Sequence, residues 1–500
     1  MPKRPIVIPF AKGYIPPNAR EISEAIGPFP KRAPVRDDEP QEELKSLSPQ
    51  DLNNETYYQC QLCDTSFWSP VPPLTFEGDW LAENVEEHQS FDTFASQISR
   101  RSGKLNYVVG ASPALLERTI LYLLPIVRID SEGSGKWPTW GPDLDALKQL
   151  VAAFFGVEVK VLEPSTIKLV LNEAEEVPAG KISEGKISIL SKPQTEESAH
   201  TTESSAMCVE PTDRHPAGTR RVSSRMKLES GLPVRSRYHH CTKHLQLFMD
   251  DISTFLKRIF ASQHYTKSGD IAEAMSVIGI TCEDLYCEGI DSLFTAGMAY
   301  LMDKVSILSF ARYHPQIRMS GMDWFDYGYT TTGTDSPYYN PGKSRPKALT
   351  PDEITVKVSE TYKIEFFRRT GKLVIHEICH LFYISHCVYY HCLMNGTGHL
   401  VEDYSAPSHE CPVCLRKLQY RFGFSIEARY RALRDVYARF GLKKEAAWVA
   451  KRLTAISKTL RHNFVTETVV VAEVGIMEDF DQAIETSKKS KSEIEVIDLT

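Results

Sequence analysis

The sequence predicts a fold of the α/β or α+β class, and three observations support this prediction. An apolar run at 119–127 is followed by a helical pattern and then by an alternating strand pattern, as in a β-α-β unit. Two further apolar runs, at 275–281 and 305–310, have the length of buried strands. The segment 360–383 has the apolar spacing of an amphipathic helix.

The β-α-β unit is defined by its boundary residues. Pro142 opens the periodic run DLDALKQLVAAFF, and Gly156 stands where a helix commonly ends in a left-handed residue. The segment 157–162 then alternates apolar and polar residues as a strand does. Because the helix crosses over between the two strands, we expect them to pair in parallel.

Further helices are predicted at about 240–261, 425–440 and 443–462, the last two separated by Gly441. By contrast, no aromatic residue occurs between 172 and 237, where a content of 10% would give six to seven. Most of this polar stretch is predicted to be a disordered insertion, because it cannot bury enough surface to order itself. The predicted regions are a partly irregular N-terminal region (1–105), a main α/β domain in two parts (106–172 and 235–424), the insertion (173–234), C-terminal helices (425–465) and a flexible tail (466–500).

Composition narrows the classes of partner. The 500 residues are 42% hydrophobic and 25% charged, with a net charge of −7 and a pI near 6.1. This acidic balance gives no reason to expect nucleic acid or an anionic membrane as a partner. The most apolar long stretch, 373–394, contains four histidines, a glutamate and three cysteines, so it is not a plausible bilayer span. We expect an intracellular protein, cytoplasmic or nuclear, whose eleven cysteines stay reduced.

The strongest chemical signal is the pattern His376-Glu377-x-x-His380. On a helix, residues four apart lie on one face, so both imidazoles can reach one metal ion. Glu377 flanks that face and can act as general base on an attacking water. His386 follows six residues after His380 and brings the imidazoles to three, the number of protein ligands that a hydrolytic zinc site needs.

A second cluster follows at once. Cys387 and Cys392 are followed, after a gap of 18 residues, by Cys411 and Cys414. Four cysteines within 28 residues can supply all the ligands of a closed tetrahedral zinc site. We therefore predict two zinc ions per chain, one catalytic and one structural.

These motifs together, HEICHLFYISHCVYYHCLM and the later CPVC, resemble the signature of archaemetzincins, zinc metallopeptidases of the metzincin group. The resemblance covers roughly 117–172 and 235–440. It implies a metzincin-like fold, with a mixed twisted sheet and an active-site helix, and an enzyme that hydrolyses peptide or protein substrates. It also places Met394 at the counterpart of the metzincin Met-turn. The resemblance assigns His376, His380 and His386 to the catalytic zinc, Glu377 to the general base, and Cys387, Cys392, Cys411 and Cys414 to the structural zinc.

One residue departs from the family pattern. Tyr383 stands where the family has a glycine, three residues after the second histidine. A glycine there can adopt a positive φ and turn the chain so that the third histidine reaches back, which a tyrosine does less easily. Either the turn is made in another way or His386 coordinates poorly.

Two alternatives therefore stay open. The chain can be a weak or inactive relative, kept as a zinc-stabilised scaffold, or a binding module that uses only the four-cysteine zinc.

Among the remaining signals, Cys60 and Cys63 form an isolated C-x-x-C that we interpret as incidental. His391, His399 and His409 are interpreted as surface or hydrogen-bonded histidines. The closing EIEVIDLT resembles a short SUMO-interacting motif, which predicts a SUMO-type partner at the tail.

Overall fold

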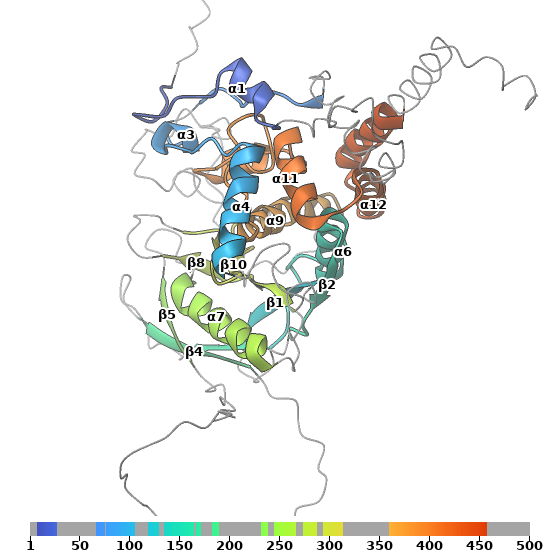
Figure 1. Ribbon diagram of the computed structural model, residues 1–500. Coiled ribbons are helices and arrows are strands. Elements are labelled where there is room, and N and C mark those ends of the chain that lie inside the picture. The colour runs from blue at the N-terminus through green and yellow to red at the C-terminus, as the bar shows by residue number, and fades with distance from the viewer. Residues whose placement is uncertain are drawn as a thin grey trace, which may run out of the picture.

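Figure 1 shows the protein as a computed structural model. The structure describes residues 8–27, 67–75, 77–105, 119–129, 135–164, 167–171, 183–189, 232–238, 245–266, 274–287, 294–313 and 360–457. The predicted tail, 466–500, and the pair Cys60 and Cys63 lie outside these residues.

The described strands form one mixed sheet. Their order is β8-β6-β5-β4-β3-β1-β7-β10-β9. The remaining strand, β2, shares one edge of β1 with β3: β2 pairs with the first half of β1 and β3 with the second half. The strand β1 pairs in parallel with β2, β3 and β7. The pairs β3–β4, β4–β5, β5–β6 and β9–β10 are antiparallel. The strands are β1 (Ile120–Arg128), β2 (Glu158–Val161), β3 (Ile167–Leu171), β4 (Ser183–Ile189), β5 (Leu232–Tyr238), β6 (Leu245–Phe248), β7 (Ala274–Thr281), β8 (Asp284–Tyr286), β9 (Gly297–Tyr300) and β10 (Val305–Ser309).

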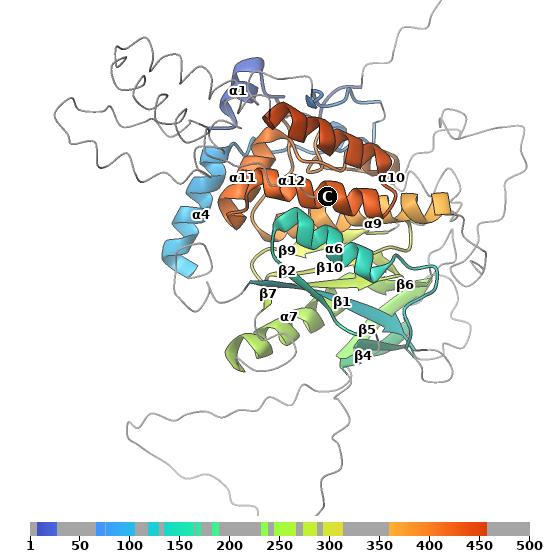
Figure 2. The same ribbon diagram turned by 90° about the vertical axis from the view of Figure 1, so that its right-hand side faces the viewer.

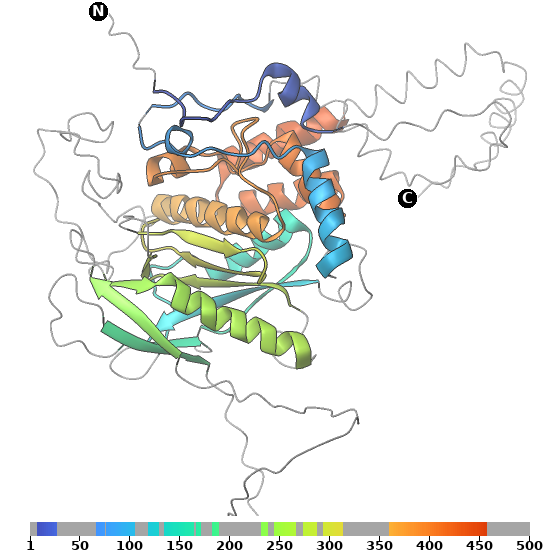
Figure 3. The same cartoon turned by 60° about the vertical axis from the view of Figure 1, so that its left-hand side comes forward.

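Helices cover both faces of this sheet, as Figure 3 shows for α7 and α9. Alternate residues of β1 point to opposite faces: Ile120 and Tyr122 pack with α7, whereas Leu121 and Leu123 pack with α6 and α9. Figure 2 shows α12 and the helix at 443–457 stacked above α6. The helices are α1 (Ala19–Glu24), α3 (Trp80–Glu83), α4 (Phe91–Leu105), α6 (Leu144–Phe155), α7 (Met249–Thr266), α9 (Glu360–Leu381), α10 (Leu400–Ser405), α11 (Pro412–Phe422) and α12 (Ile426–Arg439). The α/β prediction is therefore confirmed. Among the described helices, none combines the length and apolar character needed to cross a membrane.

The β-α-β unit forms as the sequence predicts. The side chain of Asp143 accepts hydrogen bonds from Asp145 N and Ala146 N and so caps α6, and Gly156 ends the helix with φ 67°. The strands on either side, β1 and β2, pair in parallel from Ile120 with Glu158 onwards.

One sequence-based prediction is wrong in part. The helix expected at about 240–261 begins only at Met249, because 245–248 form β6 between β5 and β8. Within the stretch 173–234, most of which is predicted to be disordered, the structure describes β4 and the first residues of β5. The strand β4 orders without an aromatic side chain because it hydrogen-bonds to a strand on each edge.

The described N-terminal segments share the main core, so they are built into the same unit as the sheet. The segments before α4 cross the helical side of the molecule, on the far side of α9 from the sheet, whereas α4 runs down toward the level of the sheet (Figure 3). Buried residues of these segments pack in one cluster with those of α9 and α11, namely Tyr14, Ile26, Trp68, Leu81, Phe94 and Ile98.

Candidate metal centre

The helix α9 presents two imidazoles on one face. His376 and His380 lie one turn apart, and their Nε2 atoms approach to 3.0 Å. The helix packs along β9 and β10, and its apolar residues Val374 and Ile378 are fully buried. The buried stripe orients the helix, and this fixes the direction in which the two imidazoles point.

The chain turns sharply at the end of α9 and brings a third imidazole to the same place. Tyr383 has φ 70°, the left-handed conformation, and its N–H donates to His380 O at 3.0 Å. After this turn the ring of His386 lies 4.8 Å from the ring of His380 and 5.4 Å from that of His376, centroid to centroid. One nitrogen from each of the three histidines lies within 4.8 Å of the other two. The turn is thus made with a tyrosine in the conformation that a glycine would adopt.

Specific contacts hold Tyr383 in this conformation. Its side chain is 6% exposed, and the Lys304 ammonium lies 4.1 Å from its ring centroid. Lys304 Nζ also donates to Leu381 O at 2.5 Å, and Gln89 Nε2 donates to Tyr383 O at 2.8 Å. Tyr383 and Lys304 are the non-glycine residues with positive φ in the described part of the chain. Two strained residues that contact each other at the third histidine indicate a locally over-determined turn.

The outer nitrogens of the three imidazoles each have a hydrogen-bond acceptor. Nδ1 of His376 lies 2.9 Å from Leu393 O, and Nδ1 of His380 lies 2.7 Å from Ile384 O. Since a carbonyl oxygen only accepts, both Nδ1 atoms are protonated, and in the neutral rings the facing Nε2 atoms carry lone pairs. Lone pairs 3.0 Å apart repel each other unless a cation lies beside them, so this donor set fits a metal ion.

Burial keeps the imidazoles of His376 and His380 neutral. It lowers the pKa of His376 to about 3, helped by the charge of His386. It lowers the pKa of His380 well below its ordinary value, helped by His376 and His386. Neutral imidazole is the form that binds a metal ion.

Glu377 lies beside the histidines and beneath the edge strand of the sheet. Its side chain is nearly buried, and a Cβ at Gly297 in β9 would lie 3.2 Å from its Cγ. Burial, and then the charge of Asp403, raises the pKa of Glu377 to about 8. A carboxyl group with such a pKa can exchange a proton near neutral pH.

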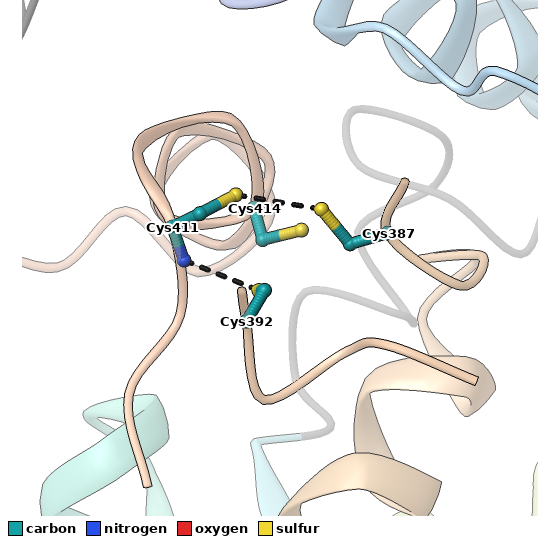
Figure 4. Close-up of side chains that lie close together, drawn as sticks. All are labelled: Cys387, Cys392, Cys411 and Cys414. Atoms are coloured by element: carbon teal, nitrogen blue, oxygen red, sulfur yellow. Dashed lines mark hydrogen bonds between the residues drawn. The ribbon is translucent and has the colours of Figure 1, made fainter. Parts of the chain in front are cut away.

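The four cysteines gather beside the loop that carries the third histidine (Figure 4). Cys387 and Cys392 come from this loop, whereas Cys411 stands at the N-cap position of α11 and Cys414 lies in its first turn. Their Sγ atoms all lie within 4.8 Å of one another, and Cys387 and Cys411 are 3.6 Å apart. A tetrahedral zinc with bonds of about 2.3 Å needs S–S edges of about 3.8 Å, so the cluster fits that ion. Backbone N–H groups of Met394 and Cys411 donate to Cys392 Sγ and so fix the position of this sulfur in the cluster.

The other histidines of this region have different surroundings. His399 Nε2 donates to Asp79 Oδ1 at 2.9 Å, and its Nδ1 accepts from Glu402 N. Although Asp79, His399 and Glu402 have metal-ligand atom types within reach of one another, both nitrogens of His399 are thus engaged by protein groups. His409 stacks on Trp448, with ring centroids 3.8 Å apart, and burial lowers its pKa to about 3. The interpretation of His399 as hydrogen-bonded is confirmed.

Sequence reasoning missed the residues that reach the site from the N-terminal segment. Glu86 Oε1 lies 2.6 Å from His386 Nδ1, and the ring of Trp80 meets that of His386 edge-on at 5.0 Å. Burial would raise the pKa of Glu86, but hydrogen bonds from His386 and Trp80 hold it below its ordinary value. Gln89 accepts from Ser385 N at 3.0 Å. These residues lie about 300 positions before their partners, and no local pattern marks them.

Several known proteins are similar in sequence to this chain. Residues 354–420 match peptidase family M54. Archaemetzincin-2 of Rattus norvegicus is 34% identical over 375 residues, which cover 72% of this chain and 73% of that protein. Archaemetzincin-2 of Macaca fascicularis is 35% identical over 223 residues, and that match spans 42% of this chain and about half, 52%, of that protein. Human archaemetzincin-1 is 32% identical over 198 residues, covering 40% of this chain and 35% of that protein.

Solved structures give distant matches. A crystal structure of archaemetzincin from Methanopyrus kandleri is 15% identical and covers 62% of this chain and 97% of its own, with a TM-score of 0.27. A zinc-dependent peptidase from Methanocorpusculum labreanum is 14% identical and covers 60% of this chain and 99% of its own, also with a TM-score of 0.27.

Proposed function

The chain belongs to the archaemetzincin family, and from this premise we propose that it is a zinc-dependent metallopeptidase with Glu377 as its general base. The observation that carries the proposal is the convergence of three imidazoles, in which the Nε2 atoms of His376 and His380 face each other at 3.0 Å. The substrates would be peptides or proteins, in keeping with the family.

The chain offers two sets of zinc ligands. His376, His380 and His386 would hold the catalytic ion and leave its fourth position open, as hydrolysis requires. A zinc ion there supplies a Lewis acid for the scissile carbonyl and for the attacking water. The four buried cysteines would hold a second, structural ion and pin the loop that carries His386.

The protein's own groups then move the proton. Glu377 accepts a proton from the attacking water and passes it to the leaving amine. Its carboxyl suits both steps because burial brings its pKa near neutrality. The edge strand β9 closes over Glu377, and the buried position limits access of bulk water to the carboxyl group.

Tyr383 supports the active-enzyme proposal over the inactive-scaffold alternative. The inactive-scaffold alternative assumes that a tyrosine makes the turn poorly and leaves His386 away from the metal. Tyr383 instead adopts φ 70°, and His386 lies beside the other two imidazoles. The single-zinc binding module predicts one tightly held ion per chain. Zinc analysis that gives two ions per chain would therefore favour the peptidase over that module.

The decisive test compares the parent with Glu377→Gln in a diverse peptide library. Both proteins should hold the same amount of zinc, since Glu377 is not one of the proposed ligands. The parent should cleave peptides and the variant should not. Equal cleavage by the two proteins would remove Glu377 from the mechanism.

Two further parts of the proposal concern location and partners. We propose an intracellular location, cytoplasmic or nuclear, which is supported by the seven cysteines of the described part of the chain, none of which forms a disulfide there. We also propose a SUMO-type partner for the closing EIEVIDLT, which lies outside the described residues. Binding of SUMO to the full chain but not to a chain with Ile497→Asp would support this partner.

A further inference from the structure

The third imidazole differs from the first two in how it is oriented. His376 and His380 stand on α9, and backbone carbonyls of Leu393 and Ile384 hold their outer nitrogens. His386 instead lies in the loop after the helix, and its Nδ1 faces the carboxylate of Glu86 at 2.6 Å. A ligand on a loop has no helical backbone to fix its ring, so its orientation depends more on this contact.

Glu86 itself is firmly placed. Trp80 Nε1 donates to the same carboxylate oxygen, and the Trp80 ring packs edge-on against His386. The backbone of Trp80 is fastened in turn, because its N–H donates to Glu402 Oε2 at 3.0 Å. The Trp80 ring also occupies the space where a side chain at Gly396 would lie. The carboxylate is therefore held by the protein before any contact with a metal ion.

The N-terminal segment also grips the turn that precedes His386. Gln89 donates to Tyr383 O at 2.8 Å and accepts from Ser385 N at 3.0 Å. Lys417 Nζ donates to Gln89 Oε1 at 3.0 Å, which ties the amide to α11. Glu86 and Gln89 thus hold the ring of His386 and the backbone before it from one short segment.

We propose that Glu86 is the positioning residue for the third metal ligand, and that the N-terminal segment is thereby an integral part of the catalytic metal site. By accepting the Nδ1–H of His386, Glu86 fixes the tautomer that turns Nε2 toward His376 and His380. Its negative charge also makes His386 a more basic ligand. This inference rests on the proposed function only in so far as the three histidines bind zinc.

The experiment measures zinc affinity at the two sites separately, by competition with a chelator, in Glu86→Ala, Glu86→Gln and Glu87→Ala. Glu87 is the matched control, because it is the adjacent glutamate and its side chain is exposed. Glu86→Ala should weaken the histidine site by about ten- to a hundred-fold. Glu86→Gln keeps an oxygen that can accept the Nδ1–H but loses the charge, so it should weaken the site less. The cysteine site should keep its zinc in all three variants and so report that the fold is intact.

The absorption spectrum of Co²⁺ in the histidine site gives a second readout. Its bands should change in Glu86→Ala and match the parent in Glu87→Ala, because ligand geometry differs only in the first. Unchanged zinc affinity and an unchanged cobalt spectrum in Glu86→Ala would overturn the inference. Should that variant also lose the cysteine-bound zinc, Glu86→Gln decides: parent-like zinc affinity at the histidine site overturns the inference, and weaker affinity supports it. A parent that binds two zinc ions but cleaves no peptide would overturn the proposed function and leave the role of Glu86 standing.

Discussion

Replacing Tyr383 separately by alanine and by glycine tests whether the turn before His386 depends on a strained backbone. Both variants lose the same buried ring and its contact with Lys304, so each should be less stable than the parent, by about 2–4 kcal/mol. They differ in the left-handed conformation, which costs alanine about 1–2 kcal/mol. Glycine loses about 0.4–1 kcal/mol through the greater freedom of the unfolded chain. Glycine should therefore be the more stable by about 0.5–1 kcal/mol.

The assay is urea unfolding of the zinc-saturated proteins, compared by their midpoints at equal slope. Ala406→Gly is the matched control, since Ala406 is also buried but has φ −57°. There glycine should be less stable than alanine, by about 0.5–1 kcal/mol. If alanine at 383 proves as stable as glycine or more so, Tyr383 is not held at positive φ in solution, and the account of the turn fails.

Two more predictions concern the structural cluster and a buried carboxyl group. Cys411→Ser should reduce bound zinc from two ions per chain to one or fewer, because it removes one of four buried ligands. The control Cys379→Ala removes a buried thiol outside the cluster and should keep both ions. Elemental analysis checks this, and equal zinc in the two variants would contradict it. Burial raises the pKa of Glu402 from 4.5 to about 7, so the folded state binds its proton more tightly and stability should fall between about pH 4.5 and 7. The free energy of unfolding of Glu402→Gln, relative to that of the parent, should increase by up to about 3 kcal/mol between pH 4 and pH 8. Melting curves at these two pH values measure this difference in stability. A difference that is the same at both pH values would refute the prediction.

Much of the fold can be predicted where the signals are local. The helix α6 has its cap, its apolar stripe and its terminal glycine within one short segment, and β1 and β2 flank it. The two histidines of α9 follow from helical spacing alone. For the run LQLF at 245–248 periodicity predicts part of the following helix, because its apolar residues continue the spacing of α7. Its actual state depends on hydrogen bonds to β5 and β8, which sequence periodicity does not record.

The same limit applies to the candidate site. Glu86 and Gln89 reach the loop of His386 from about 300 residues away, so no motif spacing includes them. At Tyr383, by contrast, the local sequence argues against the backbone conformation that the chain adopts. Local sterics disfavour it, but contacts with Lys304 and Gln89, distant in sequence, provide compensating interactions. Residue spacing thus indicated which ligands gather, whereas only the folded chain reveals what orients them.

The most direct test of the account is a crystal structure of the full chain with anomalous diffraction at the zinc edge. We predict two peaks. One should lie among Nε2 of His376, His380 and His386 at about 2.0–2.1 Å from each, and the other among the four cysteines. A single peak at the cysteines, with His386 turned away from the other two imidazoles, would contradict the proposed peptidase site.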